Sequence, residues 1–254
     1  MVVRTNPTAC IIVIGNEVLS GRTQDVNIQF LARGLAERGI VLGEVRIIPD
    51  EREVIIATVN EMRGRFDHVF TTGGIGPTHD DITSESIAAA FGVPWEKHPE
   101  AWALLEARYP PGAFNPARQR MATLPRGAGL IDNPVSGAPG FTIGNVHVMA
   151  GVPRIMQAMF RWLAPRLAGG PPVVQQAVYA RDLPEGRLAE GLGELQHTHA
   201  GVDLGSYPYE RLGGKGVAVV AKGTDPAAVE AACAAVAALM QRLGADPQPG
   251  EPPR

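Results

Sequence analysis

The chain has 254 residues, enough for one domain with a sizeable core or for one domain and a smaller one. Hydrophobic residues make up 45% of the chain, which excludes an intrinsically disordered protein. The net charge of −3 argues against a protein devoted to binding nucleic acid or a membrane surface, so we expect neither as a partner.

Three features predict the compartment. Residues 1–7 hold no long apolar run of the kind found in a signal peptide. No apolar stretch is long enough to span a bilayer. Cys10 and Cys233 lie far apart in apolar surroundings, which is typical of unpaired thiols in a reducing compartment. We therefore expect a cytoplasmic protein.

The first predicted strand is residues 9–14, a continuous apolar run rich in β-branched residues, as in a strand buried on both faces. Asp25 is placed to cap the helix that follows, and Gly39 to end it. The loop between this strand and this helix contains Gly15, Asn16, Glu17, Ser20 and Gly21.

Residues 40–48 predict a second strand, and Asp50 follows it. Asp50 and Glu53 have the spacing of a capping box. We therefore interpret Asp50 first as the cap of the next helix and only second as a ligand.

The third predicted strand is short and buried, with Val69 and Phe70 at its centre and Thr72 at its end. Thr83 is then placed to cap a helix that begins at Ser84. The segment between them carries glycines that permit positive φ and close approach to a ligand, a stiffening proline and two acidic residues. Its members are Gly73, Gly74, Gly76, Pro77, Thr78, His79, Asp80 and Asp81.

A strand, a glycine loop and a helix N-terminus together predict an anion site, because loop N–H groups and the helix dipole both favour phosphate. The adjacent Asp80 and Asp81 indicate Mg²⁺, a cation that prefers oxygen ligands and often shares a substrate phosphate. The alternative is a tight loop with a solvated acidic tip. The order of residues matches neither a Walker loop nor a Rossmann fingerprint.

The alternation of strands and helices is the signature of an α/β domain with a mostly parallel sheet and helices on both faces. Glu17, Asp50 and the Asp80–Asp81 pair each follow the carboxyl end of a strand. In a parallel sheet these ends lie along one edge, where ligands bind. The sequence therefore predicts a shared metal and phosphate site, although Glu17 is equally open to a structural role.

A second loop of small residues lies at 133–141 and would let a ligand lie against backbone, the alternative being a surface turn. Residues 141–149 predict a hairpin, and Pro153 begins the helix after it. Arg118 and Arg120 fall on a short predicted helix, where a solvated face is favoured over a phosphate contact.

We place one domain at residues 1–170 and a small α+β domain at 171–244, after a Gly-Gly-Pro-Pro linker. The expected elements of the small domain are strands at 173–180, 202–207 and 217–221 and helices at 185–196 and 226–243. The proline-rich tail, residues 245–254, is expected to be disordered.

Several of these motifs, taken in their order along the chain, resemble those of a known family. Residues 71–83, together with 15–21, 133–141 and 151–153, resemble the molybdopterin-binding (MoaB/MogA-like) domain family, and 205–208 match a motif of the following domain. The form is similar to the N-terminal region of competence/damage-inducible protein A (CinA) and to the pterin-binding-like part of FAD synthases. The chain departs from the family pattern at Asn16, His79, Ser136-Gly137 and Ala150.

The resemblance implies cleavage of a phosphoanhydride in a nucleotide. We expect a CinA-type, Mg²⁺-dependent (or other divalent cation-dependent) pyrophosphatase for ADP-ribose or FAD-like substrates. Adenylyl transfer to molybdopterin in molybdenum cofactor biosynthesis is an alternative, and so is a non-catalytic module that binds a nucleotide or pterin phosphate. We also expect a homo-oligomer.

The residues and the resemblance together assign catalysis to Asp80 and Asp81, and metal binding to Glu17, Asp50 and Asp81. The residues expected to bind phosphate or substrate are Gly15, Ser20, Gly21, Thr72, Gly73, Gly74, Gly76, Pro77, Thr78, Asn133, Gly137, Ala138, Pro139, Gly140, Gly151 and Pro153.

Overall fold

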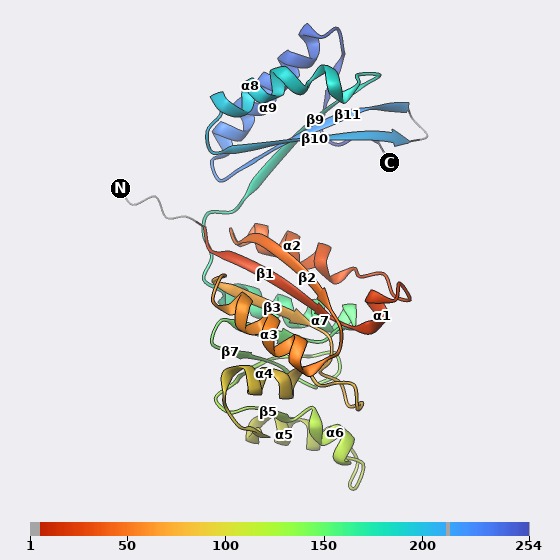
Figure 1. The fold of residues 1–254 in the computed structure, drawn as a ribbon, viewed down its shortest axis with the longest axis vertical. Helices are drawn as coiled ribbons and strands as arrows, with labels where there is room; N and C mark the ends of the chain where they lie inside the picture. Colours follow the sequence, from red (N-terminus) through yellow and green to blue (C-terminus); the bar gives the residue numbers. More distant parts are fainter. Residues whose placement is uncertain (1–5, 212–213, 254) are drawn as a thin grey trace, which may run out of the picture. The chain divides into compact units, whose positions relative to one another are not determined.

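The computed structural model describes residues 6–211 and 214–253. The chain divides into two compact units, residues 1–170 and 171–254 (Figure 1). Most of residues 1–7, for which the sequence predicts no signal peptide, and the last residue of the predicted tail lie outside the described ranges.

The first unit is built on a six-stranded sheet in the order β2-β1-β3-β8-β7-β6. Strands β2, β1, β3 and β8 run parallel, and β7 and β6 join them antiparallel. Their bounds are β1 Thr8–Ile14, β2 Val41–Ile48, β3 His68–Thr72, β6 Gly129–Ile131, β7 Gly140–Ile143 and β8 Val146–Met149. The predicted mostly parallel α/β class is confirmed, as is the β7–β8 hairpin.

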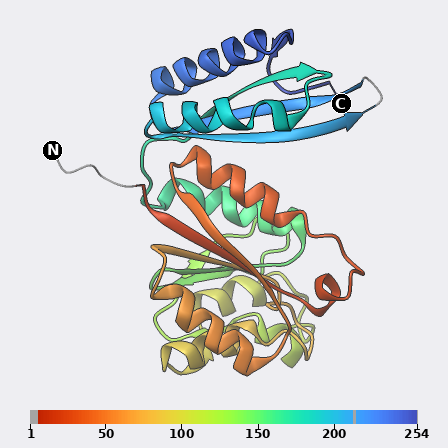
Figure 2. The same cartoon turned by 45° about the horizontal axis from the view of Figure 1, so that its top comes forward.

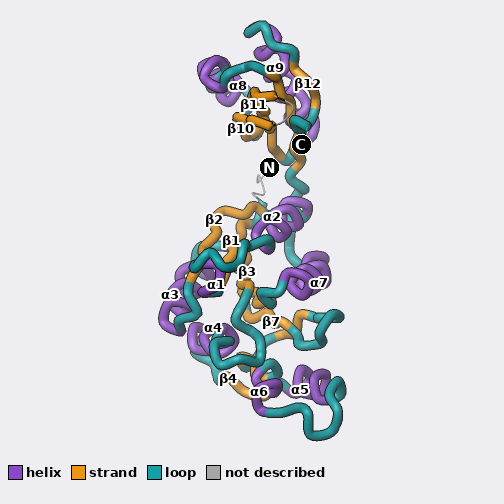
Figure 3. Tube along the Cα trace, turned by 90° about the vertical axis from the view of Figure 1, so that its right-hand side faces the viewer, coloured by secondary structure: helices purple, strands orange, loops and turns teal. Residues whose placement is uncertain are grey.

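Helices cover both faces of this sheet, because successive side chains of β1 point to opposite sides. Ile12 and Ile14 pack in one apolar cluster with α3 and α4, and Ile11 and Val13 in another with α2 and α7. Figure 3 shows the three layers, with α3 and α4 on one side of the strands and α2 and α7 on the other. The bounds are α2 Asn27–Glu37, α3 Arg52–Arg63, α4 Thr83–Phe91 and α7 Pro153–Leu163.

Short elements extend this unit beyond α4. A two-stranded antiparallel sheet pairs β4 with β5, and the side chains of His98 and Asn115 accept hydrogen bonds from the first turns of α5 and α6. The bounds are α1 Asn16–Leu19, β4 Trp95–Lys97, α5 Pro99–Glu106, α6 Pro116–Arg120, β5 Thr123–Pro125 and the 3₁₀ turn Ala164–Arg166.

The second unit is an antiparallel sheet, in the order β10-β11-β9-β12, packed on two helices (Figure 2). This confirms the small α+β domain. Helix α8 begins four residues later than predicted, because a 3₁₀ turn, Glu185–Arg187, precedes it. The bounds are β9 Val174–Arg181, α8 Ala189–Thr198, β10 Val202–Arg211, β11 Gly214–Gly223, α9 Pro226–Arg242 and β12 Pro247–Pro249.

The expectation of a disordered tail is wrong for its central residues. Strand β12 pairs antiparallel with residues 178–180 of β9, and the N–H of Gly250 donates to the carbonyl of Ala177 at 2.8 Å. Strand β9 would otherwise present an unpaired edge. Pro247 and Pro249 lack a backbone donor, which an edge strand tolerates.

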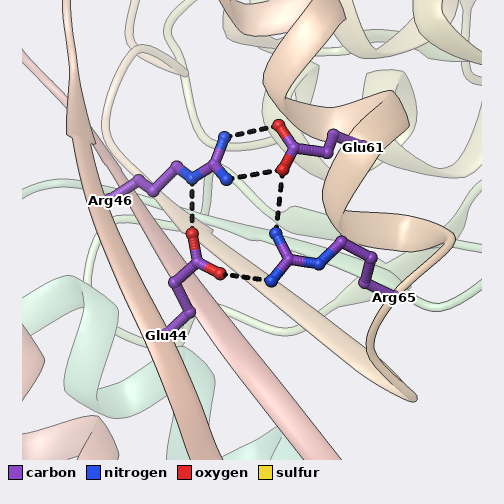
Figure 4. A network of polar contacts seen from close by, with 4 residues as sticks. All are labelled: Glu44, Arg46, Glu61 and Arg65. Carbon is purple, nitrogen blue, oxygen red and sulfur yellow. Dashed lines mark hydrogen bonds and ion pairs between the residues drawn. The ribbon is translucent and has the colours of Figure 1, made fainter.

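Four charged side chains tie the edge strand β2 to helix α3 (Figure 4). The guanidinium of Arg46 donates to both carboxylate oxygens of Glu61 at 2.6 Å and, through Nε, to Glu44 at 2.6 Å. Arg65 bridges the same two carboxylates at 2.8 Å and 2.9 Å. The hydrogen bond from Arg46 to Glu61 is the main cause that lowers the pKa of Glu61 below its ordinary value.

Glu61→Gln should therefore lower the midpoint of denaturant unfolding, because it removes the charge that both arginines share. The loss should shrink at about 1 M salt, where the Debye length is about 3 Å. It should also shrink as the pH falls below about 4.5 and disappear once the pH is below the lowered pKa of Glu61 in the folded protein, since a carboxylate with a lowered pKa contributes stability only while it is ionised. Glu53→Gln, at an exposed and loosely paired position of the same helix, is the control. A salt-independent loss would contradict the ion-pair origin.

A chain of hydrogen bonds links the neighbouring strands β3, β8 and β7 through His68, His147 and Thr142. The Nε2 of His68 lies 3.0 Å from the carbonyl of Ala168, which can only accept, so Nε2 donates. The Nδ1 of His68 lies 3.2 Å from Nε2 of His147, and Nδ1 of His147 lies 3.0 Å from the Thr142 hydroxyl. Burial, aided by the charge of His68, lowers the pKa of His147 to about 3.

Stability should consequently fall as the pH drops below about 6.5, because His147 binds a proton in the unfolded chain but stays neutral in the folded protein. The free energy of unfolding should decrease by about 2 kcal/mol between pH 6.5 and pH 5 from this residue. Denaturant titrations should show a shallower decrease for His147→Gln, whereas His197→Gln, at an exposed position, should keep the wild-type slope. Equal slopes for wild type and His147→Gln would show that another group is responsible.

Candidate functional site

The carboxyl ends of the parallel strands meet at one edge of the sheet, as in other open α/β folds. A cavity of about 610 Å³ lies there. It is lined by most of the residues that the sequence places in the site: Glu17, Asp50, Gly73, Gly74, Gly76, Pro77, Thr78, Asp80, Asp81, Asn133, Ala138, Gly151 and Pro153.

Seven predicted ligand-binding residues do not line this cavity. Thr72 is buried at the end of β3, and Gly140 starts β7, where an added Cβ would meet the Val148 carbonyl oxygen at 2.5 Å. The others are Gly15, Ser20, Gly21, Gly137 and Pro139.

Sequence reasoning missed the apolar side of the cavity. Ile155 and Met159 contribute from α7, four residues apart and so on one helix face. That spacing was the available signal, but it is equally the pattern of a core face. The remaining unpredicted lining residues are Ile14, Thr23, Ile75, Met121, Ser136, Ala150 and Val152.

Two glycines set the shape of the loop after β3. Gly73 has a φ of +107° and Gly74 a φ of +67°, both in the region that disfavours other residues. An added Cβ would lie 2.1 Å from the Ile14 carbonyl oxygen at Gly73 and 2.2 Å from the Thr83 hydroxyl at Gly74. The loop therefore lies directly against both β1 and the start of α4.

The prediction that Thr83 caps a helix starting at Ser84 is wrong. Helix α4 begins at Thr83 itself, and its N-cap position, Ile82, makes no side-chain cap bond. The Thr83 hydroxyl donates to the carbonyl of Gly73 at 3.0 Å, and its N–H donates to the carbonyl of Gly74 at 3.0 Å. Thr83 thus holds the positive end of the α4 dipole against the glycine loop.

The carboxylate of Asp81 is turned back onto the loop. Its Oδ2 accepts from the N–H of Thr78 at 2.8 Å and from the Thr78 hydroxyl. A Cβ at Gly76 would lie 2.6 Å from the same oxygen. Asp80 is exposed, and the nearby Thr78 hydroxyl and the N–H of Asp80 itself hold the pKa of Asp80 below its ordinary value. Asp80 therefore stays ionised at neutral pH.

Asp50 is not the helix cap that its spacing predicts. The N-cap of α3 is Glu51, with no side-chain cap bond, and Oδ2 of Asp50 instead accepts from the N–H of Asn16 at 2.8 Å. Burial raises the pKa of Asp50 above its ordinary value, and the N–H of Asn16 opposes this rise. Three further negative charges add to the rise, those of Glu17, Asp80 and Asp81.

The predicted metal ligands do not form a ready coordination shell. Within residues 6–211 and 214–253, no three His, Cys, Asp or Glu side chains are grouped to hold a metal ion. Each predicted ligand is engaged locally, because Glu17 folds over Gly15, Asp50 accepts from Asn16 and Asp81 accepts from Thr78. Mg²⁺ needs only one or two carboxylates beside water and substrate phosphate, so this set of oxygen donors still fits it.

Asn133 organises the second loop rather than facing a ligand freely. It is 2% exposed, and its amide nitrogen donates to the Ser136 hydroxyl at 2.6 Å and to the carbonyl of Ala138 at 2.7 Å. Its Oδ1 accepts from the N–H groups of Val135 and Ser136. Ser136 and Ala138 are thereby held at the cavity wall.

None of the helices in the described parts of the chain has both the length and the apolar character that crossing a bilayer requires.

An open parallel sheet with a glycine loop, a helix N-terminus and carboxylates around one cavity defines an α/β protein that binds its ligand at the carboxyl edge of the sheet. The chain belongs to the family described as "Probable molybdopterin binding domain", whose model matches residues 10–169. Residues 172–247 match the family described as "FAD synthase, middle domain". The resemblance seen in the sequence is thereby confirmed.

Individual relatives agree with this assignment. A CinA-like protein of Parasynechococcus marenigrum (strain WH8102) is 33% identical over 244 residues, which cover 91% of this chain and 58% of the relative. This chain therefore spans little more than half the length of that relative. A protein of Pyrobaculum arsenaticum is 35% identical over 210 residues, covering 79% of each chain.

Among solved structures, the chain is similar to the crystal structure of the protein CinA with unknown function from Thermoplasma acidophilum. The TM-score is 0.60 at 30% identity, and the match covers 63% of this chain and 97% of the other.

Gly74→Ala should destabilise the protein by more than the roughly 1–2 kcal/mol that a left-handed conformation costs alanine, because its Cβ also clashes with Thr83. Gly21→Ala is the matched control, since Gly21 has a similar φ of +73° with nothing within 4 Å of the added Cβ. Chemical denaturation measures both. Equal losses would show that the contact with Thr83 does not constrain the loop.

Proposed function

We propose that the protein hydrolyses the phosphoanhydride bond of an ADP-containing dinucleotide, such as ADP-ribose or FAD, with Mg²⁺ or another divalent cation as cofactor. Water would add to one phosphorus as the bridging P–O bond breaks. The products would be AMP together with ribose 5-phosphate or FMN, and the two protons of the water would be divided between the phosphate products and the solvent.

The observation that carries this proposal is the meeting of an acidic wall and a glycine loop around one cavity. Four carboxylates line it, those of Glu17, Asp50, Asp80 and Asp81, and burial first, then the charges of the other three, raise the pKa of Asp50. A cation bound together with a phosphate would relieve that repulsion. The cavity volume is also in the range of small-molecule sites.

The glycine loop and α4 are placed to bind the diphosphate. Gly73 and Gly74 let the backbone lie close to a ligand without a side chain in the way, and the N-terminus of α4 adds a partial positive charge. Asp50 and Asp81 would hold the cation. When bound, Mg²⁺ would neutralise phosphate charge as the anhydride breaks.

Asp80 is the carboxylate best placed to orient the attacking water. It is exposed at the cavity wall, and its lowered pKa keeps it ionised, so it can accept a hydrogen bond or a proton from water. Its carboxylate would not serve as a general acid at neutral pH, for the same reason.

The apolar side of the cavity suits a flat ring system. Ile75 and Ile155 line it, and Val152 is 57% exposed beside them, whereas Met159 at the same wall is fully buried. An adenine or isoalloxazine ring would remove this surface from water. The cavity thus combines the two kinds of surface that a dinucleotide presents.

The family match at residues 10–169 favours a second candidate, adenylyl transfer from ATP to molybdopterin. A third, binding without turnover, is favoured by Asn16 and His79, because both depart from the family pattern. The structure gives Asn16 a role in holding Asp50 through its backbone N–H, which any residue except proline would provide at that position.

The test is AMP release from a panel of ADP-ribose, FAD, NAD and ATP, with and without EDTA. We expect metal-dependent AMP release from ADP-ribose or FAD, lowered about 100-fold or more by Asp50→Asn, because a ligand of the cation that would neutralise the phosphates is removed. Glu51→Gln, exposed and outside the cavity lining, should be unaffected.

Release of no AMP from any member of the panel would exclude hydrolysis. Metal-dependent transfer of AMP from ATP to molybdopterin would establish the second candidate instead. Tight binding without product would establish the third.

A further inference from the structure

The cavity that we assign to a diphosphate is lined, among described residues, by four carboxylates and by no arginine or lysine. A dianionic ligand held only by glycine backbone would face strong repulsion from this wall. A basic side chain close to this wall would therefore matter for binding.

One such side chain is Arg120, the last residue of α6. It lines a small side cavity, with room for about one water molecule, that shares Ile75, Gly76, Asp81 and Met121 with the main cavity. The guanidinium thus lies directly behind the glycine loop. The solvated face that the sequence favours for Arg118 and Arg120 is not what the structure shows, because both residues are half-buried.

The guanidinium of Arg120 has N–H groups that make no strong hydrogen bond to the described residues. Its only hydrogen bond in the described chain is a long one, from Nη2 to the carbonyl of Asp81 at 3.4 Å. Its Nε is buried and has no hydrogen-bond partner. A buried donor left unpaired costs free energy, and an anionic oxygen, reached directly or through one water molecule, would remove that cost.

Arg120 is also held in place before any ligand binds. The guanidinium carbon lies 5.1 Å from the ring centroid of Trp95. The Trp95 Nε1 donates to the Ser84 hydroxyl at 3.0 Å, and this hydroxyl donates to the carbonyl of Thr123 at 3.1 Å. The indole is therefore a fixed platform, so little side-chain entropy remains to be lost on binding.

We propose that Arg120 binds the diphosphate of the substrate and supplies the positive charge that the cavity wall lacks. This assignment rests on the proposed function for the identity of the ligand. It deepens that function, because it makes recognition depend on the phosphate charge and not only on the ring.

Arg118 provides a matched control on the same helix. Its Nη1 donates to the carbonyl of Ala113, and its guanidinium lies 4.3 Å from the ring of Tyr109. It lines neither cavity. Arg118→Met removes the same charge from the same helix without touching the site.

The experiment measures binding of ADP and of adenosine by calorimetry in EDTA, so that neither metal nor turnover contributes. Arg120→Met should weaken ADP binding about 10- to 100-fold, as expected for loss of a charge-assisted hydrogen bond, and leave adenosine binding unchanged. Arg120→Lys should retain part of the affinity, and Arg118→Met all of it. Thermal unfolding checks that each variant is folded.

ADP binding to Arg120→Met within about twofold of wild type, or an equal loss for ADP and adenosine, overturns the proposal. So does a wild-type protein that binds no ADP. A wild-type protein that binds ADP but releases no AMP with metal defeats the hydrolase function alone, and the effect of Arg120→Met on ADP binding still decides the role of Arg120.

Discussion

The close approach of the loop after β3 to its neighbours is the constraint on which the site depends. At Gly73 the backbone passes so near the end of β1 that a Cβ would lie 2.1 Å from the carbonyl oxygen of Ile14. At Gly74 it meets the side chain of Thr83, which bonds back to the loop. These contacts join two parallel strands and a helix N-terminus at one point. They leave a concave backbone surface at the edge where such sheets bind ligands.

The acidic residues around this surface have two roles at once. Asp81 and Asp50 each use one oxygen to hold neighbouring backbone, through Thr78 and Asn16. The same carboxylates bring negative charge to the cavity wall, and burial together with that charge raises the pKa of Asp50. The site is therefore preorganised but electrostatically unbalanced. Such an imbalance is expected where a cation and an anion are to be bound together.

The positive charge available to this site comes from a segment with weak sequence signals. Helix α6 has only five residues, and its two arginines look alike in the sequence. The structure separates them, since Arg120 lies behind the glycine loop against Trp95 and Arg118 packs on Tyr109. A one-turn helix and a two-stranded sheet thus extend the site beyond the central fold. Their role depends on tertiary structure, because only the folded chain brings Arg120 together with Trp95 and the glycine loop.

The sequence by itself determined the α/β fold, the glycine loop and the edge of the sheet where acidic residues gather. Apolar strand runs, helical periodicity and glycine spacing are local patterns. They depend only on residues close together in the chain, so the sequence shows them directly. It did not determine which backbone group each side chain would bond. Asp50 has the spacing of a cap, yet it bonds Asn16, 34 residues away. Thr83 likewise bonds Gly73 rather than capping α4. Tertiary structure decided these partners, the pairing of the tail with β9 and the burial of Arg120, because each joins segments that only the folded chain brings together.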